Sequence, residues 1–288
     1  MGAIDGPVAF VTGASRGIGK AVAIAFAQDG YDVAITARSK VEGEEREHSS
    51  TVRETNTRPL PGSLQSTAEA ITATGRSVLA VPSDLMDLAS VGAATAVVLE
   101  RWGRVDVLVN NGRYVGPGHM DLFLDTPVEL IERHITANVV SPLHILKMVL
   151  PGMLERGNGT VITMTSSAGY ADPPAPAGAG GWGMGYSVSK GALHRVAGVL
   201  AVEHAHSGIR FFNVNPGGVA TERIKADMSG FGFDGDQWAP PALIGAVLTW
   251  LASSDDALSL GIDIKAQELA LERGLYPEWT GNAHAKRA

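Results

Sequence analysis

The chain has 288 residues, of which 45% are apolar and 18% charged, so it can bury a sizeable core and is not globally disordered. Its formal net charge of −7 argues against a nucleic-acid-binding surface, which requires a basic face. Because it contains no cysteine, disulfides, thiolate metal sites and cysteine nucleophiles are excluded. The sequence has neither a long apolar run nor a leader-like start, so we expect a cytoplasmic protein without membrane contacts.

The first clear motif is a glycine-rich turn between a predicted strand and a predicted helix. Residues 8–11 form a short apolar run typical of a buried strand, and residues 20–28 form an alanine-rich run typical of a buried helix. Between them, Gly13, Gly17 and Gly19 allow a sharp turn and the close approach of a ligand. The start of the helix directs unpaired N–H groups and its positive dipole end at this turn, which favours a phosphate. This context predicts a dinucleotide site, with an ordinary glycine-rich turn as the alternative.

The second predicted strand, residues 32–37, ends where a dinucleotide-binding fold places the residue that reads the adenosine ribose. An acidic residue there would bind the 2′-hydroxyl of NAD, whereas Arg38 suits the 2′-phosphate of NADP; a surface arginine is the alternative. Residues 39–66 show no sustained periodicity, which is unusual for so long a stretch in a compact domain. We therefore predict an insertion that starts near the adenosine end. Whether its basic residues touch a cofactor stays open.

The rest of the chain alternates between helices and strands. Helices are predicted at about 67–74, 88–102, 126–154, 186–205 and 241–252, and strands at 77–81, 105–109, 160–164, 210–214 and, less regularly, 261–264. This alternation implies a single doubly wound α/β domain over residues 1–288, with a parallel sheet and helices on both faces. Ligands of such sheets bind beyond the carboxyl ends of the strands. The residues expected there are Gly13, Arg38, Asp84, Asn111, Ser166 and Gly217.

Tyr186 and Lys190 lie four residues apart at the start of a predicted helix, so they share one face. A free tyrosine, with a pKa near 10, is almost entirely neutral at pH 7. A nearby ammonium group lowers that pKa and makes the phenol usable as a general acid or base. Many helices carry such a pair by chance, so the pair alone does not establish an active site.

Further motifs accompany this pair in a fixed order. They are Thr12 with the three glycines, Asn110-Asn111-Gly112, Asn138, Ser166, and Pro216-Gly217 with Val219 and Thr221. From about residue 5 to residue 225 the set resembles the short-chain dehydrogenase/reductase family, in its branch of single Rossmann domains. The resemblance implies an oxidoreductase that moves hydride between a nicotinamide cofactor and a carbonyl or secondary alcohol. The alternative is a non-catalytic dinucleotide-binding sensor or scaffold, which would be expected to lack the acid–base tyrosine.

The resemblance implies four catalytic residues. Tyr186 would pass a proton to or from the substrate oxygen, and Lys190 would lower the pKa of Tyr186 and hold the nicotinamide ribose. Ser166, which fits the family spacing better than Ser167, would hydrogen-bond the substrate carbonyl. Asn138 would anchor a water that links Lys190 to solvent.

The resemblance also implies a cofactor site that prefers NADP(H), with NAD(H) possible. Arg16 and Arg38 resemble the pair that marks NADP-preferring members. Asp84 would meet the adenine, Asn111 the adenosine ribose, and the backbone of Val219 the nicotinamide amide. Further cofactor contacts are implied for Thr12, Gly13, Ser15, Gly17, Ile18, Gly19, Leu85, Pro216, Gly217 and Thr221, together with Tyr186 and Lys190. A homodimer or homotetramer is implied as well.

Three features depart from the family pattern. Arg113 stands where the family usually has a glycine after Asn110-Asn111-Gly112, and the insertion at 39–66 is absent from most members. The glycine pair usual after the last strand is missing. Ile264 is followed instead by Lys265-Ala266-Gln267-Glu268. The C-terminal packing, and a tetramer interface formed there, therefore do not follow from the resemblance.

Two segments, at about 170–185 and 221–241, are placed to cover the substrate. They carry the apolar candidates Tyr170, Trp182, Met228 and Trp238, and no cluster of basic residues, because Arg223 and Lys225 stand alone. We therefore predict a neutral, apolar carbonyl substrate; the alternative is that these side chains pack the two segments against each other. His194, His204 and His206 have no metal-ligand partners at useful spacing, so we expect helix-surface histidines and no metal. The sequence gives neither the substrate nor the physiological direction.

Overall fold

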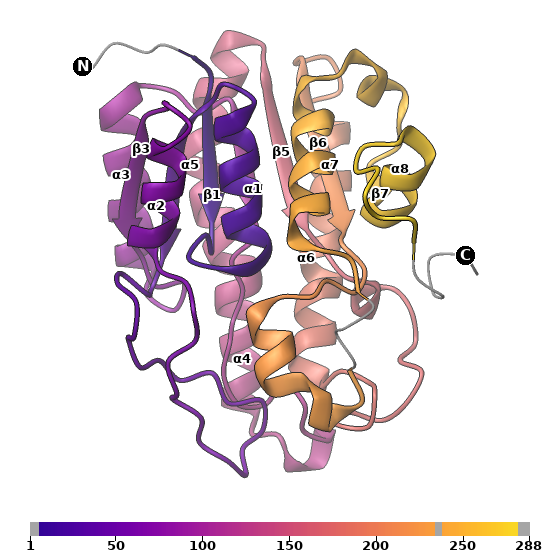
Figure 1. The fold of residues 1–288 in the computed structure, drawn as a ribbon. Coiled ribbons are helices and arrows are strands. Elements are labelled where there is room, and N and C mark those ends of the chain that lie inside the picture. The colour runs from indigo at the N-terminus through magenta and orange to yellow at the C-terminus, as the bar shows by residue number, and fades with distance from the viewer. Residues whose placement is uncertain (1–5, 234–237, 282–288) are drawn as a thin grey trace.

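The computed structural model describes residues 6–233 and 238–281. It contains a seven-stranded, all-parallel sheet in the order β3-β2-β1-β4-β5-β6-β7 (Figure 1). The strands are β1 (Val8–Thr12), β2 (Asp32–Ala37), β3 (Val78–Pro82), β4 (Val107–Asn110), β5 (Gly159–Met164), β6 (Ile209–Asn215) and β7 (Asp263–Lys265). Each predicted strand is present within two residues at either end. The predicted doubly wound α/β fold is confirmed.

The order of the strands reverses at β1, which pairs with β2 on one side and β4 on the other. The connections that leave these strands diverge to opposite sides of the sheet, which opens a crevice at their carboxyl ends. The glycine-rich turn follows β1 directly. The fold thus places the predicted dinucleotide motif at the point where parallel sheets bind ligands.

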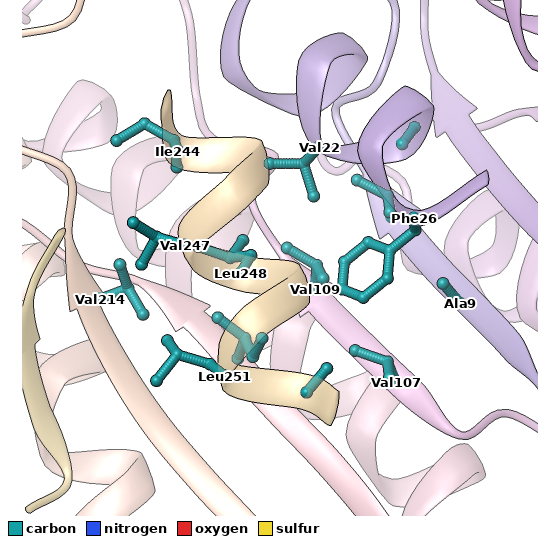
Figure 2. Packing of buried hydrophobic residues seen from close by; sticks show 14 of the residues in the cluster. Ala9, Val22, Phe26, Val107, Val109, Val214, Ile244, Val247, Leu248 and Leu251 are labelled. Atoms are coloured by element: carbon teal, nitrogen blue, oxygen red, sulfur yellow. The ribbon is translucent and has the colours of Figure 1, made fainter. Parts of the chain in front are cut away.

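Helices cover both faces of the sheet (Figure 1). One face carries α1 (Gly17–Gln28), α2 (Leu64–Thr72) and α7 (Pro241–Ser253), and the other carries α3 (Leu88–Trp102), α5 (Ser141–Arg156) and α6 (Met184–Glu203). Figure 2 shows α7 packed against α1, where Phe26 and Leu248 meet the β4 residue Val109. The two helices approach closely because α7 has a glycine there: a Cβ on Gly245 would lie 2.9 Å from the Cβ of Ala25.

A continuous helical stretch, predicted at 126–154, runs from α4 (Val128–Ile135) through a π-helical turn, η2 (Thr136–Val140), into α5. Its length and apolar composition would allow it to cross a membrane, but half of its most apolar window is buried in the fold. It therefore packs in this fold as a core helix does, and its apolar composition is not evidence that it spans a membrane. The π-helical turn contains Asn138, and such turns are frequent at functional sites.

The C-terminal region explains one departure from the family pattern. Instead of a glycine pair, β7 leads directly into α8 (Ala266–Arg273). The Gln267 side chain of α8 donates hydrogen bonds to the carbonyls of Pro216 and Gly218, each at 2.8 Å. A side chain thus fixes the turn after β6.

Candidate active site

The glycine-rich turn has the geometry that its sequence predicts. Gly13 and Gly17 have φ angles of +67° and +56°, which other residues rarely adopt. A Cβ on Gly19 would lie 2.3 Å from the carbonyl oxygen of Gly13, so no larger residue fits. The hydroxyl of Thr12 accepts hydrogen bonds from the backbone N–H groups of Asn111 and Gly112, at 3.1 and 2.9 Å. The ends of β1 and β4 are thereby joined beneath the turn.

Asn111 has a structural function in addition to its predicted contact with the ribose. Its side-chain amide donates to the carbonyls of Thr12 and Gly13, at 2.8 and 3.2 Å. These bonds hold the turn in place. The residue still lines the cavity beside the turn, so the contact with a ribose stays a prediction.

A cavity of about 240 Å³ begins at this turn. It brings together most of the predicted cofactor residues: Gly13, Ser15, Arg16, Gly17, Ile18, Gly19, Arg38, Asp84, Leu85, Asn111 and Thr221. The insertion contributes further lining residues, among them Arg46, His48 and Leu60. Thr12, Pro216, Gly217 and Val219 support the surrounding turns without lining this cavity. Tyr186 and Lys190 do not line it either.

Arg16 contacts the end of the insertion, which the sequence did not indicate. Its guanidinium group donates to the carbonyls of Pro61 and Gly62, at 2.9 and 2.7 Å, and to the hydroxyl of Ser39 at 3.3 Å. Burial lowers the pKa of Arg16, and nearby Arg38 lowers it further. Both arginines line the cavity, at the end where the sequence predicts the adenosine ribose.

Tyr186 and Lys190 are both buried, on the first turns of α6. The Lys190 ammonium lies 5.8 Å from the centre of the Tyr186 ring and donates a 2.6 Å hydrogen bond to the carbonyl of Met164, at the end of β5. Ser166 follows two residues later; it is half-buried, and its hydroxyl accepts a hydrogen bond from the N–H of Ala168 at 3.3 Å. Ser167 is exposed, and the choice of Ser166 stays a prediction.

Asn138 connects two other elements of the site. Its side-chain oxygen accepts a hydrogen bond from the N–H of Tyr114 at 2.6 Å, and its amide donates to the hydroxyl of Ser189 at 2.8 Å. Ser189 in turn donates to the carbonyl of Tyr186 at 2.8 Å. The buried amide therefore fixes the loop after β4 against the first turn of α6. The predicted water link to Lys190 stays a prediction.

The pKa of Lys190 is lowered to about 7, mainly by burial and secondarily by the charge of Arg113. In the unfolded chain the ordinary value of 10.5 applies, so between these values the unfolded chain binds more protons than the folded one. We therefore expect the free energy of unfolding of the cofactor-free protein to rise with pH from about 7 to 9. Lys190→Met should flatten this rise, as measured by denaturant unfolding at several pH values. A slope that is identical in the two proteins would contradict the assignment.

Four residues near Tyr186 were not predicted as site residues. The guanidinium carbon of Arg113 lies 5.7 Å from the centre of the Tyr186 ring, and the His119 ring lies 4.7 Å from it. His134 stacks on His119, with the rings 5.8 Å apart, and Arg223 lines the cavity together with Arg113. Burial lowers the pKa of His119 well below its ordinary value and that of His134 to about 3, so both imidazoles are neutral. Only Arg113 carried a signal in the sequence, as a departure from the family pattern.

The predicted substrate residues divide into two groups. Trp182, Met228 and Trp238 belong to one apolar cluster with Phe233 and Met120, and the Trp182 ring lies 5.0 Å from that of Tyr186. Tyr170 lies apart: it is half exposed, packs on His194 and accepts a hydrogen bond from Asn215 at 2.9 Å. The two covering segments thus pack against each other, as in the alternative that the sequence left open, and their cluster lies beside Tyr186, so the apolar substrate stays a prediction. Residues 234–237 of the second segment lie outside the described residues.

The insertion connects the cofactor end of the cavity with the second covering segment, below the carboxyl ends of the strands (Figure 1). Within that segment, η4 (Ile224–Met228) carries Asp227. Its carboxylate lies 2.8 Å from Nδ1 of His48 and accepts a hydrogen bond from the Asn56 amide at 3.1 Å. Both side chains of the His48–Asp227 pair are 5% exposed. We call this contact the insertion latch.

In the part of the chain that the structure describes, no group of three or more side chains is arranged to hold a metal ion. His204 and His206 follow the end of α6 instead of lying on its surface; His206 is exposed, and His204 is half-buried with its ring 6.2 Å from that of Phe211. His194 differs: its ring lies 3.4 Å from the Asp263 carboxylate and is largely covered.

Comparisons with known proteins agree with this geometry. The family model for short chain dehydrogenase matches residues 7–62 and 57–229. The oxidoreductase UcpA of Salmonella typhimurium is 33% identical over 223 residues, covering 77% of this chain and 72% of that protein. An uncharacterized NAD-dependent oxidoreductase of Mycobacterium tuberculosis is 32% identical over 229 residues, covering 78% and 76%. A metagenomic short-chain oxidoreductase solved with NADP is 27% identical, with a TM-score of 0.66 and coverage of 91% and 97%. The chain therefore belongs to the short-chain dehydrogenase family of oxidoreductases.

Proposed function

We propose that the protein is an NADP(H)-dependent oxidoreductase that reduces a carbonyl group or oxidises a secondary alcohol, with Tyr186 as the acid–base residue. The observation that carries the proposal is the placement of Tyr186 and Lys190. Both are buried together, and Arg113, which lines the cavity of the glycine-rich turn, contacts the Tyr186 ring. Binding a dinucleotide without catalysis does not require a tyrosine and a lysine buried together in this way.

The residues of this chain divide the reaction between them. A bound nicotinamide cofactor would supply or accept the hydride at the reacting carbon. In the reduction, Tyr186 donates its phenolic proton to the carbonyl oxygen, and Ser166 donates a hydrogen bond to the same oxygen. Lys190, whose ammonium is directed by the Met164 carbonyl, stabilises the phenolate that remains. In the oxidation, the same groups act in the reverse direction.

The cofactor site fits a phosphorylated dinucleotide. The cradle at Gly13 and Gly19 excludes a Cβ, as the close approach of a pyrophosphate requires. Arg38 lines the same cavity after β2, where a 2′-phosphate would lie, and Arg16 lies beside it. The relatives differ on this point, because one is named NAD-dependent and another was solved with NADP. The two arginines favour NADP(H), although NAD(H) also fits the remaining site.

Arg38→Asp tests the cofactor preference. Each charge-assisted hydrogen bond to the 2′-phosphate contributes about 1.5–3 kcal/mol, so the unmodified protein should favour NADPH over NADH by roughly tenfold to several hundredfold in kcat/KM. The variant should lose or invert that ratio, because the new carboxylate repels the phosphate. Fluorescence titration with both cofactors gives the dissociation constants. Equal use of NADH and NADPH by the unmodified protein would contradict the proposal.

The apolar cluster around Trp182 supports a substrate with an apolar body, next to Tyr186. The neutral charge that the sequence predicts for this substrate has less support, because Arg113 and Arg223 line the cavity that begins at the glycine-rich turn, and Arg113 contacts the Tyr186 ring. We also propose a cytoplasmic homo-oligomer. Val188, Val199 and Val202 expose apolar side chains along α6, and such a stripe favours contact with a second copy.

A further inference from the structure

Arg223 is buried with only part of its guanidinium group satisfied. It is 7% exposed, and its Nη2 donates to the carbonyl of His48 at 3.3 Å and to the hydroxyl of Ser50 at 3.1 Å. Nε and Nη1 are buried and have no hydrogen-bond partner among the described residues. The Asp227 carboxylate, four residues along the chain, is occupied by His48 and Asn56. Two buried donors of a cation are therefore free for a ligand.

Arg113 is a second cation at the cavity of the glycine-rich turn, which Arg223 also lines. One of its nitrogens, Nη1, donates to the carbonyl of Tyr114 at 2.9 Å, and its guanidinium carbon lies 5.7 Å from the centre of the Tyr186 ring. Its charge and that of Arg223 repel each other, and the pKa of Arg223 is lowered to about 9, first by burial and next by Arg113. Among the described residues, neither arginine forms an ion pair with a carboxylate.

Arg223 is buried and Arg113 is half-buried, and neither forms an ion pair with a carboxylate among the described residues, an arrangement that is costly for a folded protein. An anion bound at the two guanidinium groups would offset that cost, because guanidinium groups bind carboxylates with paired, charge-assisted hydrogen bonds. The site lies against Tyr186, at the predicted position of the reacting oxygen. An anion bound there would be part of the reacting molecule, a few bonds from its carbonyl.

We propose that Arg113 and Arg223 form a carboxylate-binding subsite, and that the substrate is an oxo acid or the corresponding hydroxy acid with an apolar body. This proposal rests on the proposed function of Tyr186. It replaces the predicted neutral substrate with an anionic one, while the cluster of Trp182 and Phe233 receives the apolar remainder. The other anion that could reach these cations is a phosphate of the cofactor. The glycine-rich turn already offers the helix-start N–H groups to that phosphate, and Arg113 contacts Tyr186 instead.

The test compares acids with their methyl esters on the same carbon skeleton. We would measure kcat/KM with NADPH for 2-oxooctanoate, 3-oxooctanoate and the two methyl esters. The unmodified protein should prefer at least one acid over its ester by at least tenfold. Arg113→Met and Arg223→Met should each lower the acid-to-ester ratio of kcat/KM by about tenfold to a hundredfold, whatever their effect on the ester alone. Lys225→Met, which removes an exposed cation from the same segment, is the matched control and should change neither.

Binding measurements separate the possible failures. NADP⁺ cannot reduce an oxo acid, so calorimetric titration of the enzyme–NADP⁺ complex with the preferred acid reports binding without turnover. Loss of this binding in both variants supports the subsite even if the assignment of Tyr186 fails.

Turnover of the esters at least equal to that of both acids would overturn the subsite and leave the proposed function intact. A weaker NADPH affinity in the variants with an unchanged acid-to-ester ratio would also overturn it, because the cations would then bind the cofactor. If a methionine variant fails to fold, Arg113→Lys and Arg223→Lys, which keep the charge but lose the paired donors, should still reduce the acid-to-ester ratio.

Discussion

Tyr186→Phe should lower kcat by about 10²–10⁴-fold, the contribution that general acid–base catalysis usually makes. The substitution removes only the hydroxyl, and the ring keeps its contacts with Trp182 and His119, at 5.0 and 4.7 Å between ring centres. The fold and the NADPH affinity should therefore survive. Steady-state NADPH oxidation, together with a fluorescence titration of NADPH, measures the two quantities separately.

The serines beside Tyr186 provide the control. Ser166→Ala should also reduce turnover, because it removes a donor to the substrate oxygen, whereas Ser167→Ala, at an exposed position, should have a much smaller effect. Nearly normal turnover in Tyr186→Phe would show that another group moves the proton. A larger loss in Ser167→Ala than in Ser166→Ala would show that the wrong serine was chosen.

Asp227→Ala should lower the free energy of unfolding by about 1–3 kcal/mol, the usual cost of leaving a buried polar group without its partner. The change removes the carboxylate that lies 2.8 Å from His48 Nδ1 and that accepts the hydrogen bond of the Asn56 amide, inside the insertion latch. It also releases η4 from the insertion, so proteolysis within residues 40–58 should become faster. Urea unfolding and limited trypsin digestion measure the two effects.

A second ion pair of the insertion makes a matched control. Arg53 of the insertion pairs with Asp125 at 2.8 Å, but both side chains are largely exposed, at 72% and 42%. Asp125→Ala should therefore cost at most about 1 kcal/mol, as is usual for surface pairs. Equal losses of stability in the two variants would mean that burial of the latch contributes nothing.

The strands and the glycine-rich turn could be predicted because their signal is local. A parallel strand buried on both faces is a short apolar run, and the turn after β1 has glycines where the backbone requires a positive φ or a close approach. The start of α2 shows that hydrophobic periodicity alone does not locate the first residue of a helix. Its helix begins at Leu64 rather than near residue 67, because Ser63 caps it with a hydrogen bond from the N–H of Ser66.

The insertion could not be placed from the sequence because its contacts are distant in the chain. His48 and Asn56 meet Asp227 more than 170 residues later, and neither segment has a periodic pattern that marks the contact. Arg16 shows the same limit in another form. The sequence indicates a cation suited to a phosphate, but not that the carbonyls of Pro61 and Gly62 would already hold part of it. Arg113 was visible as a departure from the family pattern, yet only the fold shows that it lies against Tyr186.

The insertion touches both ends of the cavity, and this has a thermodynamic consequence. At one end Arg16 binds its last residues, and at the other the latch binds η4. A ligand that orders one end reduces the conformational entropy that remains to be lost at the other. NADPH and substrate should therefore bind with positive cooperativity, and by reciprocity each should raise the affinity of the other by the same factor.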